Sequence, residues 1–260
     1  MTSNPTVSVW YHLDAASNVA VVEFSRPPAN YFDVELITAI ADIYAELDAN
    51  PQCRAMVLAS IGKHFCAGAD FSQGQLSEEK SKRLYAQAAR LFSYGVPVVA
   101  AVQGRAIGGG LGVAMSADFR VASASSHFVC NFSQLGTHHG FGLSVTLPAV
   151  IGQQRTLELL YTGADVLGTT AFEIGLCDRL VADDDAIRDE AIAFAERIAS
   201  SSPLAVRAIR RTMWASKYPD LIQQATDLER QEQAVLFSTD DFQEGVRAAA
   251  ARRRPIFVGK

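Results

Sequence analysis

The residues that decide the fold read Pro97-Val-Val-Ala-Ala-Val-Gln-Gly-Arg-Ala-Ile-Gly-Gly-Gly-Leu-Gly-Val-Ala-Met-Ser-Ala-Asp118. A valine-rich apolar run ends at Gln103-Gly104, three glycines follow at Gly108–Gly110, and small residues at helical spacing come next. This order predicts a strand, a turn and a helix. Glycines at the start of a helix leave backbone N–H groups uncovered, and the aligned peptide dipoles favour negative charge there. The stretch is therefore suited to bind an anion or an oxyanion.

The glycines alone do not identify the ligand. A dinucleotide site requires Gly-x-Gly-x-x-Gly near the first strand and an acidic residue about 20 residues later, and a phosphate loop requires Gly-Lys-Ser/Thr. Neither pattern is present in this chain. Tight packing of a helix on a strand explains small residues equally well, so at this point both interpretations stay open.

The composition limits the class of protein. The chain has 260 residues and a net charge of −5, which gives a general nucleic-acid role no electrostatic basis. No apolar run reaches the length of a membrane span and the first residues do not form a signal peptide, so we expect a soluble, cytoplasmic protein. The four cysteines lack the spacing of metal ligands and are expected to be buried thiols, at Cys53, Cys66, Cys130 and Cys177.

The order of the predicted elements indicates an α/β protein. Val7–Tyr11 and Val19–Phe24 predict a hairpin, and strands then alternate with helices, which favours parallel pairing and strands buried on both faces. From Leu143 onward the pattern is helical, and only Leu176–Val181 predicts a strand. The helical tail has too little core of its own, so we expect it to pack on a neighbour, in the same chain or in another subunit.

A second glycine loop, Phe65-Cys-Ala-Gly-Ala-Asp70, precedes the first one. With both loops located, the sequence resembles the crotonase superfamily of enoyl-CoA hydratases and isomerases. The resemblance covers essentially the whole chain, in Arg26-Pro-Pro-Ala-Asn30, the two glycine loops, Leu159–Gly163, Ala171–Asp178, and Glu244-Gly with Arg254-Pro-Ile-Phe257 near the end.

The resemblance implies a core of ββα spiral turns at residues 1–195 and a helical C-terminal trimerisation region at 196–260, often assembled as a homotrimer or a dimer of trimers. It implies an acyl-CoA thioester as substrate, with coenzyme A as part of that substrate and no separate cofactor or metal. By position, the backbone N–H groups of Ala69 and Gly109 would hold the thioester oxygen. Such donors stabilise the charge that an enolate or a tetrahedral intermediate places on this oxygen.

Further contacts with the substrate follow from the same resemblance. Asp70 fits a loop-shaping role as well as a coenzyme A contact. The C-terminal Phe257 and Lys260 either meet the nucleotide of a neighbouring subunit or form a solvated end. The full set of implied contacts is Ala29, Ala67, Asp70, Phe71, Phe257 and Lys260.

The chain departs from the hydratase pattern at both acid–base positions. Gly112 and Phe132 stand where hydratases of this superfamily carry their two glutamates. General acid–base groups contribute about 10²–10⁴ each in rate, so the ordinary hydration mechanism should be impaired. The sequence also resembles the chlorobenzoyl-CoA dehalogenases, but Gly140 and Tyr85 replace the aspartate and histidine of that chemistry.

Two histidines are the remaining acid–base candidates. His138 and His139 lie on the loop that family members place over the reacting carbons, and an imidazole with a pKa near 6.5 can exchange protons at neutral pH. Two loop histidines bonded to backbone or solvent fit the pattern as well. We expect an enoyl-CoA hydratase/isomerase-like enzyme; a non-catalytic acyl-CoA-binding protein and another crotonase reaction, such as thioester hydrolysis, stay open.

Overall fold

The computed structural model describes residues 7–71, 77–215 and 218–260. The larger of two sheets contains, in spatial order, β1 (Ser8–Asp14), β2 (Val19–Ser25), β3 (Ala55–Ser60), β4 (Val98–Val102), β6 (Phe119–Ser123) and β9 (Arg179–Val181). β1 and β2 form an antiparallel hairpin, and the other neighbours pair in parallel. Every residue of β3 and β4 is buried, which confirms the expectation of strands covered on both faces.

The smaller sheet contains β5 (Arg105–Ile107), β7 (His127–Val129) and β8 (Asp165–Leu167). The prediction that only one strand follows residue 143 is wrong, because β8 pairs antiparallel with β7. β5 was also missed between the predicted turn and helix. Both strands have three residues with only the middle one buried, so neither carries an alternating pattern long enough to predict a strand.

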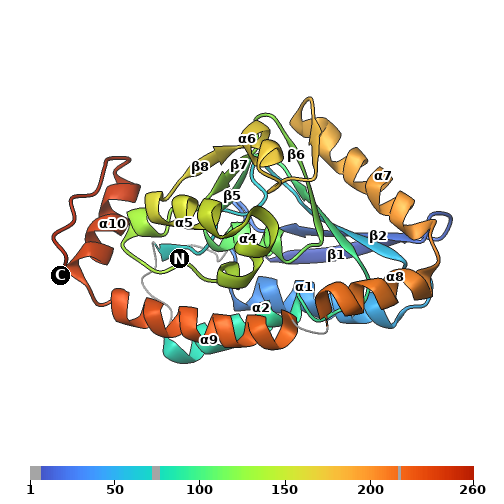
Figure 1. Cartoon of the computed structure of the whole chain (residues 1–260), viewed down its shortest axis with the longest axis horizontal. Coiled ribbons are helices and arrows are strands. Elements are labelled where there is room, and N and C mark those ends of the chain that lie inside the picture. Colours follow the sequence, from blue (N-terminus) through green and yellow to red (C-terminus); the bar gives the residue numbers. More distant parts are fainter. Residues whose placement is uncertain (1–6, 72–76, 216–217) are drawn as a thin grey trace.

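Helices surround the sheets (Figure 1). In chain order they are α1 (Val34–Ala49), α2 (Glu78–Arg90), α3 (Gly109–Met115), α4 (Leu143–Ile151), α5 (Gln153–Thr162), α6 (Gly168–Glu173), α7 (Ile187–Ala199), α8 (Pro203–Arg210), a π-helical turn at Arg211–Ala215, α9 (Tyr218–Leu236) and α10 (Asp240–Ala250). Asp33 caps α1 by accepting a hydrogen bond from the Leu36 amide at 2.9 Å, and aspartate is among the residues preferred at the start of a helix.

The two faces of the larger sheet pack into separate apolar clusters. Alternate residues of β3 point to opposite faces, with Val57 in the cluster that includes Ala195 of α7 and Leu58 in the cluster that includes Leu36 and Ile40 of α1. The second cluster is the larger one and extends to Cys66 in a glycine loop and Ala106 in β5. Strand ends and the loops that follow them are thereby fixed in place.

The helical tail packs on the body of the same chain. α9 lies against α2 and α4, and Figure 1 shows it running along one side of the molecule, with α10 and the C-terminus at its far end. Arg210 of α8 is buried, and its Nε donates to both carboxylate oxygens of Asp118, at 3.0 and 2.9 Å. The division between residues 1–195 and 196–260 stays a prediction, and in the structure that point lies within α7.

All four cysteines are buried free thiols, as predicted. Burial raises the pKa of the Cys53 and Cys177 thiols to about 11, and that of Cys66 and Cys130 to about 12. These groups are therefore neutral at physiological pH. No helix within the described ranges has both the length and the apolar character of a membrane span.

Candidate active site

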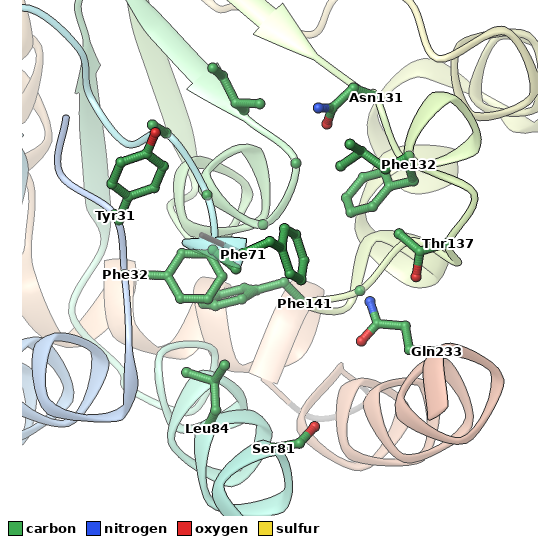
Figure 2. A pocket seen from close by; sticks show the side chains of 18 of the residues that line it. Tyr31, Phe32, Phe71, Ser81, Leu84, Asn131, Phe132, Thr137, Phe141 and Gln233 are labelled. Atoms are coloured by element: carbon green, nitrogen blue, oxygen red, sulfur yellow. The ribbon is translucent and has the colours of Figure 1, made fainter. Parts of the chain in front are cut away.

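A cavity of about 400 Å³ lies between the two glycine loops, α2, α9 and the loop that follows β7. Figure 2 shows that side chains from these separate elements converge on it. Its lining is mostly apolar, with aromatic side chains on several sides. Ala69 and Gly109, which are 40 residues apart in the chain, both line this cavity. The structure thus brings the two predicted amide positions to one site.

Hydrogen bonds hold the two glycine loops against each other. The Ile107 amide donates to the Cys66 carbonyl at 2.9 Å, and the Phe32 amide donates to the Gly68 carbonyl at 2.9 Å. Gly68 has φ of +86°, and a β-carbon there would lie 2.7 Å from the Ile107 carbonyl oxygen and 3.8 Å from the Gly109 nitrogen. Only glycine fits this close approach at a positive φ.

The amides of Ala69 and Gly109 have no acceptor among the hydrogen bonds that the described residues form. Gly109 is the first residue of α3, where a helix leaves its N–H groups unpaired. The ring of Phe32 lies over this glycine, since a β-carbon on Gly109 would come within 2.5 Å of the Phe32 Cε1 and Cζ atoms. Among the described residues, the Ala69 and Gly109 amides are therefore two backbone donors without an acceptor, and Gly109 lies against an aromatic ring.

A cluster of two polar side chains lies at another part of the cavity wall. The Tyr85 hydroxyl of α2 donates to Gln233 Oε1 of α9 at 2.8 Å, and Gln233 Nε2 donates to the His138 carbonyl at 2.9 Å. A β-carbon on Gly140 would lie 2.1 Å from Tyr85 Oη and 2.9 Å from Gln233 Nε2. We call Tyr85, Gln233 and Gly140 the polar corner. Its geometry requires glycine at position 140.

Two more polar side chains line the cavity. Asn131 Oδ1 lies 3.3 Å from the position of a β-carbon on Gly108, next to the start of α3. Thr137 is 7% exposed, and its hydroxyl is buried without a hydrogen-bond partner in the part of the chain that the structure describes. Sequence reasoning missed Asn131, Thr137 and Gln233, because none of them belongs to a motif and only the fold brings them together.

Comparison with known proteins identifies the family of the chain. The sequence profile of the enoyl-CoA hydratase/isomerase family matches residues 14–260. The chain belongs to the enoyl-CoA hydratase/isomerase family.

The relatives match along nearly the whole chain. An (E)-benzylidenesuccinyl-CoA hydratase of Thauera aromatica is 30% identical over 253 residues, which cover 95% of this chain and 98% of that protein. A crotonyl-CoA hydratase of Syntrophomonas wolfei is 31% identical over 255 residues, covering 95% and 97%. The crystal structure of an enoyl-CoA hydratase/isomerase from Pseudoalteromonas atlantica has a TM-score of 0.85 at 27% identity, covering 96% of this chain and all of that one. The predicted crotonase fold is confirmed.

Gly112 and Phe132, the two positions that the resemblance aligns with the glutamates of hydratases, have different surroundings in the structure. Phe132 lines the cavity, whereas Gly112 lies outside the lining. A β-carbon on Gly112 would lie 2.3 Å from Phe141 Cβ and 2.7 Å from Phe141 Cγ. The Phe141 ring in turn meets Phe32 edge to face, with centroids 5.5 Å apart. Aromatic side chains therefore occupy both places, Phe132 at its own position and Phe141 beside Gly112.

The two loop histidines stack on each other beside the cavity, and neither belongs to its lining. His139 Nε2 is 2.7 Å from the Ser144 hydroxyl and 4.0 Å from the buried carboxylate of Glu229. Burial, together with the nearby His138, lowers the pKa of His139 to about 3, so its imidazole is neutral at pH 7. Their acid–base role stays a prediction.

Burial raises the pKa of the Glu229 carboxyl, which accepts hydrogen bonds from the amides of Gly142 and Ser144. These two hydrogen bonds connect Glu229 of α9 to the end of the loop after β7 and to the first turn of α4.

The other predicted contacts divide into two groups. Ala67 and Phe71 line the cavity. Ala29 is outside the lining, and its carbonyl accepts a hydrogen bond from the Ala67 amide at 3.1 Å. Asp70 follows Ala69 and is also outside the lining.

The C-terminal contacts lie elsewhere in the chain. Phe257 is 40% exposed, and the Lys260 carbonyl accepts from the Asp241 amide on α10. Contact of Phe257 and Lys260 with a neighbouring subunit stays a prediction.

Proposed function

We propose that this family member acts on an acyl-CoA thioester whose carbonyl oxygen accepts hydrogen bonds from the Ala69 and Gly109 amides. The observation that carries the proposal is that both amides lack an acceptor within the described residues and belong to the wall of one cavity. Fixed donors of this kind are aimed at charge that appears during the reaction. Removing one such donor costs about 3–4 kcal/mol in other enzymes.

The chemistry proposed is of the hydratase or isomerase type, through a thioester enolate. Within the described residues, no carboxylate, imidazole, ammonium, guanidinium or thiol lines the cavity. The Asn131 amide and the hydroxyls of the lining would then position water or substrate, and the oxyanion donors would carry most of the rate enhancement. Because each acid–base group contributes about 10²–10⁴, we expect turnover well below that of a hydratase with two glutamates.

A non-catalytic acyl-CoA-binding protein is the second candidate. The same lack of acid–base side chains in the described lining favours it. The two candidates differ in one measurement: turnover of crotonyl-CoA and longer or branched enoyl-CoAs, followed by loss of the conjugated thioester absorbance. Release of free thiol in the same assay would indicate thioester hydrolysis. Tight binding with no turnover of any of these thioesters would exclude the enzyme.

The role of Gly109 can be tested by removing its N–H group. Proline fits the first position of a helix, where no intrahelical hydrogen bond is lost. Its ring would meet Phe32, so the substitution Gly109→Pro is made in a Phe32→Ala protein and compared with Phe32→Ala alone. We expect a further loss of about 10²–10³ in kcat/KM. Equal activity of the two folded proteins would contradict the assigned role.

The assembly is also proposed as a homotrimer or a dimer of trimers, in the cytoplasm. Leu204 and Met213 on adjoining turns of the tail are 80% and 73% exposed, an apolar surface that contact with a second copy would cover. Light scattering of the purified protein measures the mass directly. A monomer of 28.0 kDa at all concentrations would contradict this assembly.

A further inference from the structure

Phenylalanine rings line several sides of the cavity. Phe32, Phe71, Phe132 and Phe141 all line it, together with Phe237 of α9, and Figure 2 shows the first four around the same space. Phe32 and Phe141 meet at 61° with centroids 5.5 Å apart, and Phe71 and Phe237 meet at 64° with centroids 6.1 Å apart. Rings in these orientations offer both edges and faces, which are the partners that another aromatic ring prefers.

The size of the cavity favours a short acyl group. Its volume of about 400 Å³ lies near the lower end of the range of about 300–1,000 Å³ for small-molecule sites. A thioester head with one ring is compact and planar, whereas a long alkyl chain needs an extended channel. The rings of Phe132 and Phe141 are themselves 7% and 2% exposed, so their packing limits the space on that side.

The polar corner supplies hydrogen-bonding atoms within this apolar wall. Because Gln233 Nε2 donates to the His138 carbonyl, the orientation of its amide is fixed, and Oε1 accepts from Tyr85. Among the described residues, the second Nε2 hydrogen of Gln233 and the lone pairs of Tyr85 Oη have no partner. Burial raises the pKa of Tyr85, which keeps the hydroxyl protonated. The corner can therefore donate one hydrogen bond and accept another.

We infer that the acyl group is an aromatic one bearing a ring hydroxyl, held between the phenylalanines with its hydroxyl at the Tyr85–Gln233 pair. A hydroxyl both donates and accepts, so it matches the two functions of the corner that have no partner among the described residues. Leaving those functions buried without a partner would cost free energy. This inference rests on the proposed function of the same cavity.

The test measures binding of saturated thioesters, which have no double bond to react. Calorimetry compares butyryl-CoA, 3-phenylpropanoyl-CoA, and its 3- and 4-hydroxyphenyl analogues. We expect the phenyl group to lower Kd at least tenfold relative to butyryl, from added apolar burial and ring contacts. Of the 3- and 4-hydroxyphenyl thioesters, the one that binds more tightly should have a Kd lower by a further factor of about three to ten.

Two variants, each with a matched control, show which side chains cause the phenyl and hydroxyl effects on Kd. Tyr85→Phe should remove the hydroxyl increment, while Tyr161→Phe, on a side chain 75% exposed and outside the cavity lining, should keep it. Phe71→Leu should reduce the preference for phenyl over butyryl, while Phe172→Leu, at a half-exposed ring outside the lining, should not. Circular dichroism checks that each variant is folded.

The outcomes separate this inference from the proposed function. Equal affinity for butyryl and phenylpropanoyl thioesters would overturn the inference and leave acyl-CoA binding intact. A hydroxyl increment that is absent, or that persists in Tyr85→Phe, would also overturn it. No binding of any of these thioesters would overturn the proposed function itself.

Discussion

A β-carbon on Gly112 would lie 2.3 Å from the β-carbon of Phe141. Phe141 is 2% exposed, and it has φ of +65°, a conformation that costs little only for glycine. The space into which a glutamate at position 112 would extend is therefore filled by a ring held in a strained backbone. Glycine at position 112 and the ring of Phe141 therefore form one packing arrangement.

Gly112→Glu should consequently fail to create a hydratase. We expect it to destabilise the fold by at least about 2 kcal/mol through overpacking, which lowers Tm by several degrees in a chain of this size. Calorimetry and a crotonyl-CoA assay measure both properties. The double variant Gly112→Glu with Phe141→Gly should be more stable than the sum of the two single changes predicts, by about 1 kcal/mol or more. Strictly additive effects would contradict the steric account.

The buried His139 should make the protein less stable at acidic pH. Its pKa of about 3 in the folded state is below the value of about 6.5 for an exposed histidine. Between these values the unfolded chain binds more protons, so stability falls as the pH decreases below 6.5 and is fully present above it. From pH 7 to pH 5 this effect amounts to about 2 kcal/mol.

The raised pKa of Glu229 has the opposite effect on stability, so the comparison is made between the protein and its His139→Gln variant. Urea unfolding at several pH values should show a smaller acid loss in the variant. Parallel curves would rule out a depressed His139 pKa. The same variant tests catalysis. Because His139 lies outside the cavity lining, against the Phe132 ring that lines it, we expect kcat to change less than fivefold. A loss of 10² or more would support proton transfer by this side chain.

The ion pair of Asp118 and Arg210 should be a major link between the tail and the core. Their side chains are 14% and 5% exposed, and Asp118 also accepts a hydrogen bond from the Val98 amide at 2.8 Å. Asp118→Asn leaves the Arg210 charge buried without its counter-ion, so we expect a loss of about 3–5 kcal/mol. The control is Asp42→Asn, whose exposed pair with Arg90 should contribute at most about 1 kcal/mol. Equal losses in urea unfolding would contradict this assignment.

Local sequence patterns were sufficient for the fold class. The valine-rich β4, the capped α1 and the two glycine loops each carry their signal within a few residues. The pairing of Ala69 with Gly109 came from the family resemblance that the two loops carry, and in the structure both residues line one cavity. β5 and β8 have no such signal, because three residues are too few for an alternating pattern. The order of these elements was thus predictable only in part.

The side-chain wall of the cavity was not predictable from local sequence. Gln233 lies on an amphipathic helix almost 150 residues from Tyr85, and only the packing of α9 on α2 makes them partners. Phe141 resembles any apolar loop residue until the backbone shows its approach to Gly112. Such long-range contacts follow from tertiary packing, which no spacing rule within one element contains.

Infrared spectroscopy can measure directly how far the two backbone amides polarise the thioester carbonyl. Butyryl-CoA labelled with ¹³C at the carbonyl can be bound without reacting, and its stretching frequency compared with that in water. The account predicts a shift to lower frequency on binding, because preorganised donors in an apolar cavity polarise the bond more than water does. It also predicts that the shift is reduced when Gly109→Pro is added to the Phe32→Ala protein. A bound thioester with the frequency that it has in water, or with a shift that Gly109→Pro does not change, would contradict polarisation by these amides.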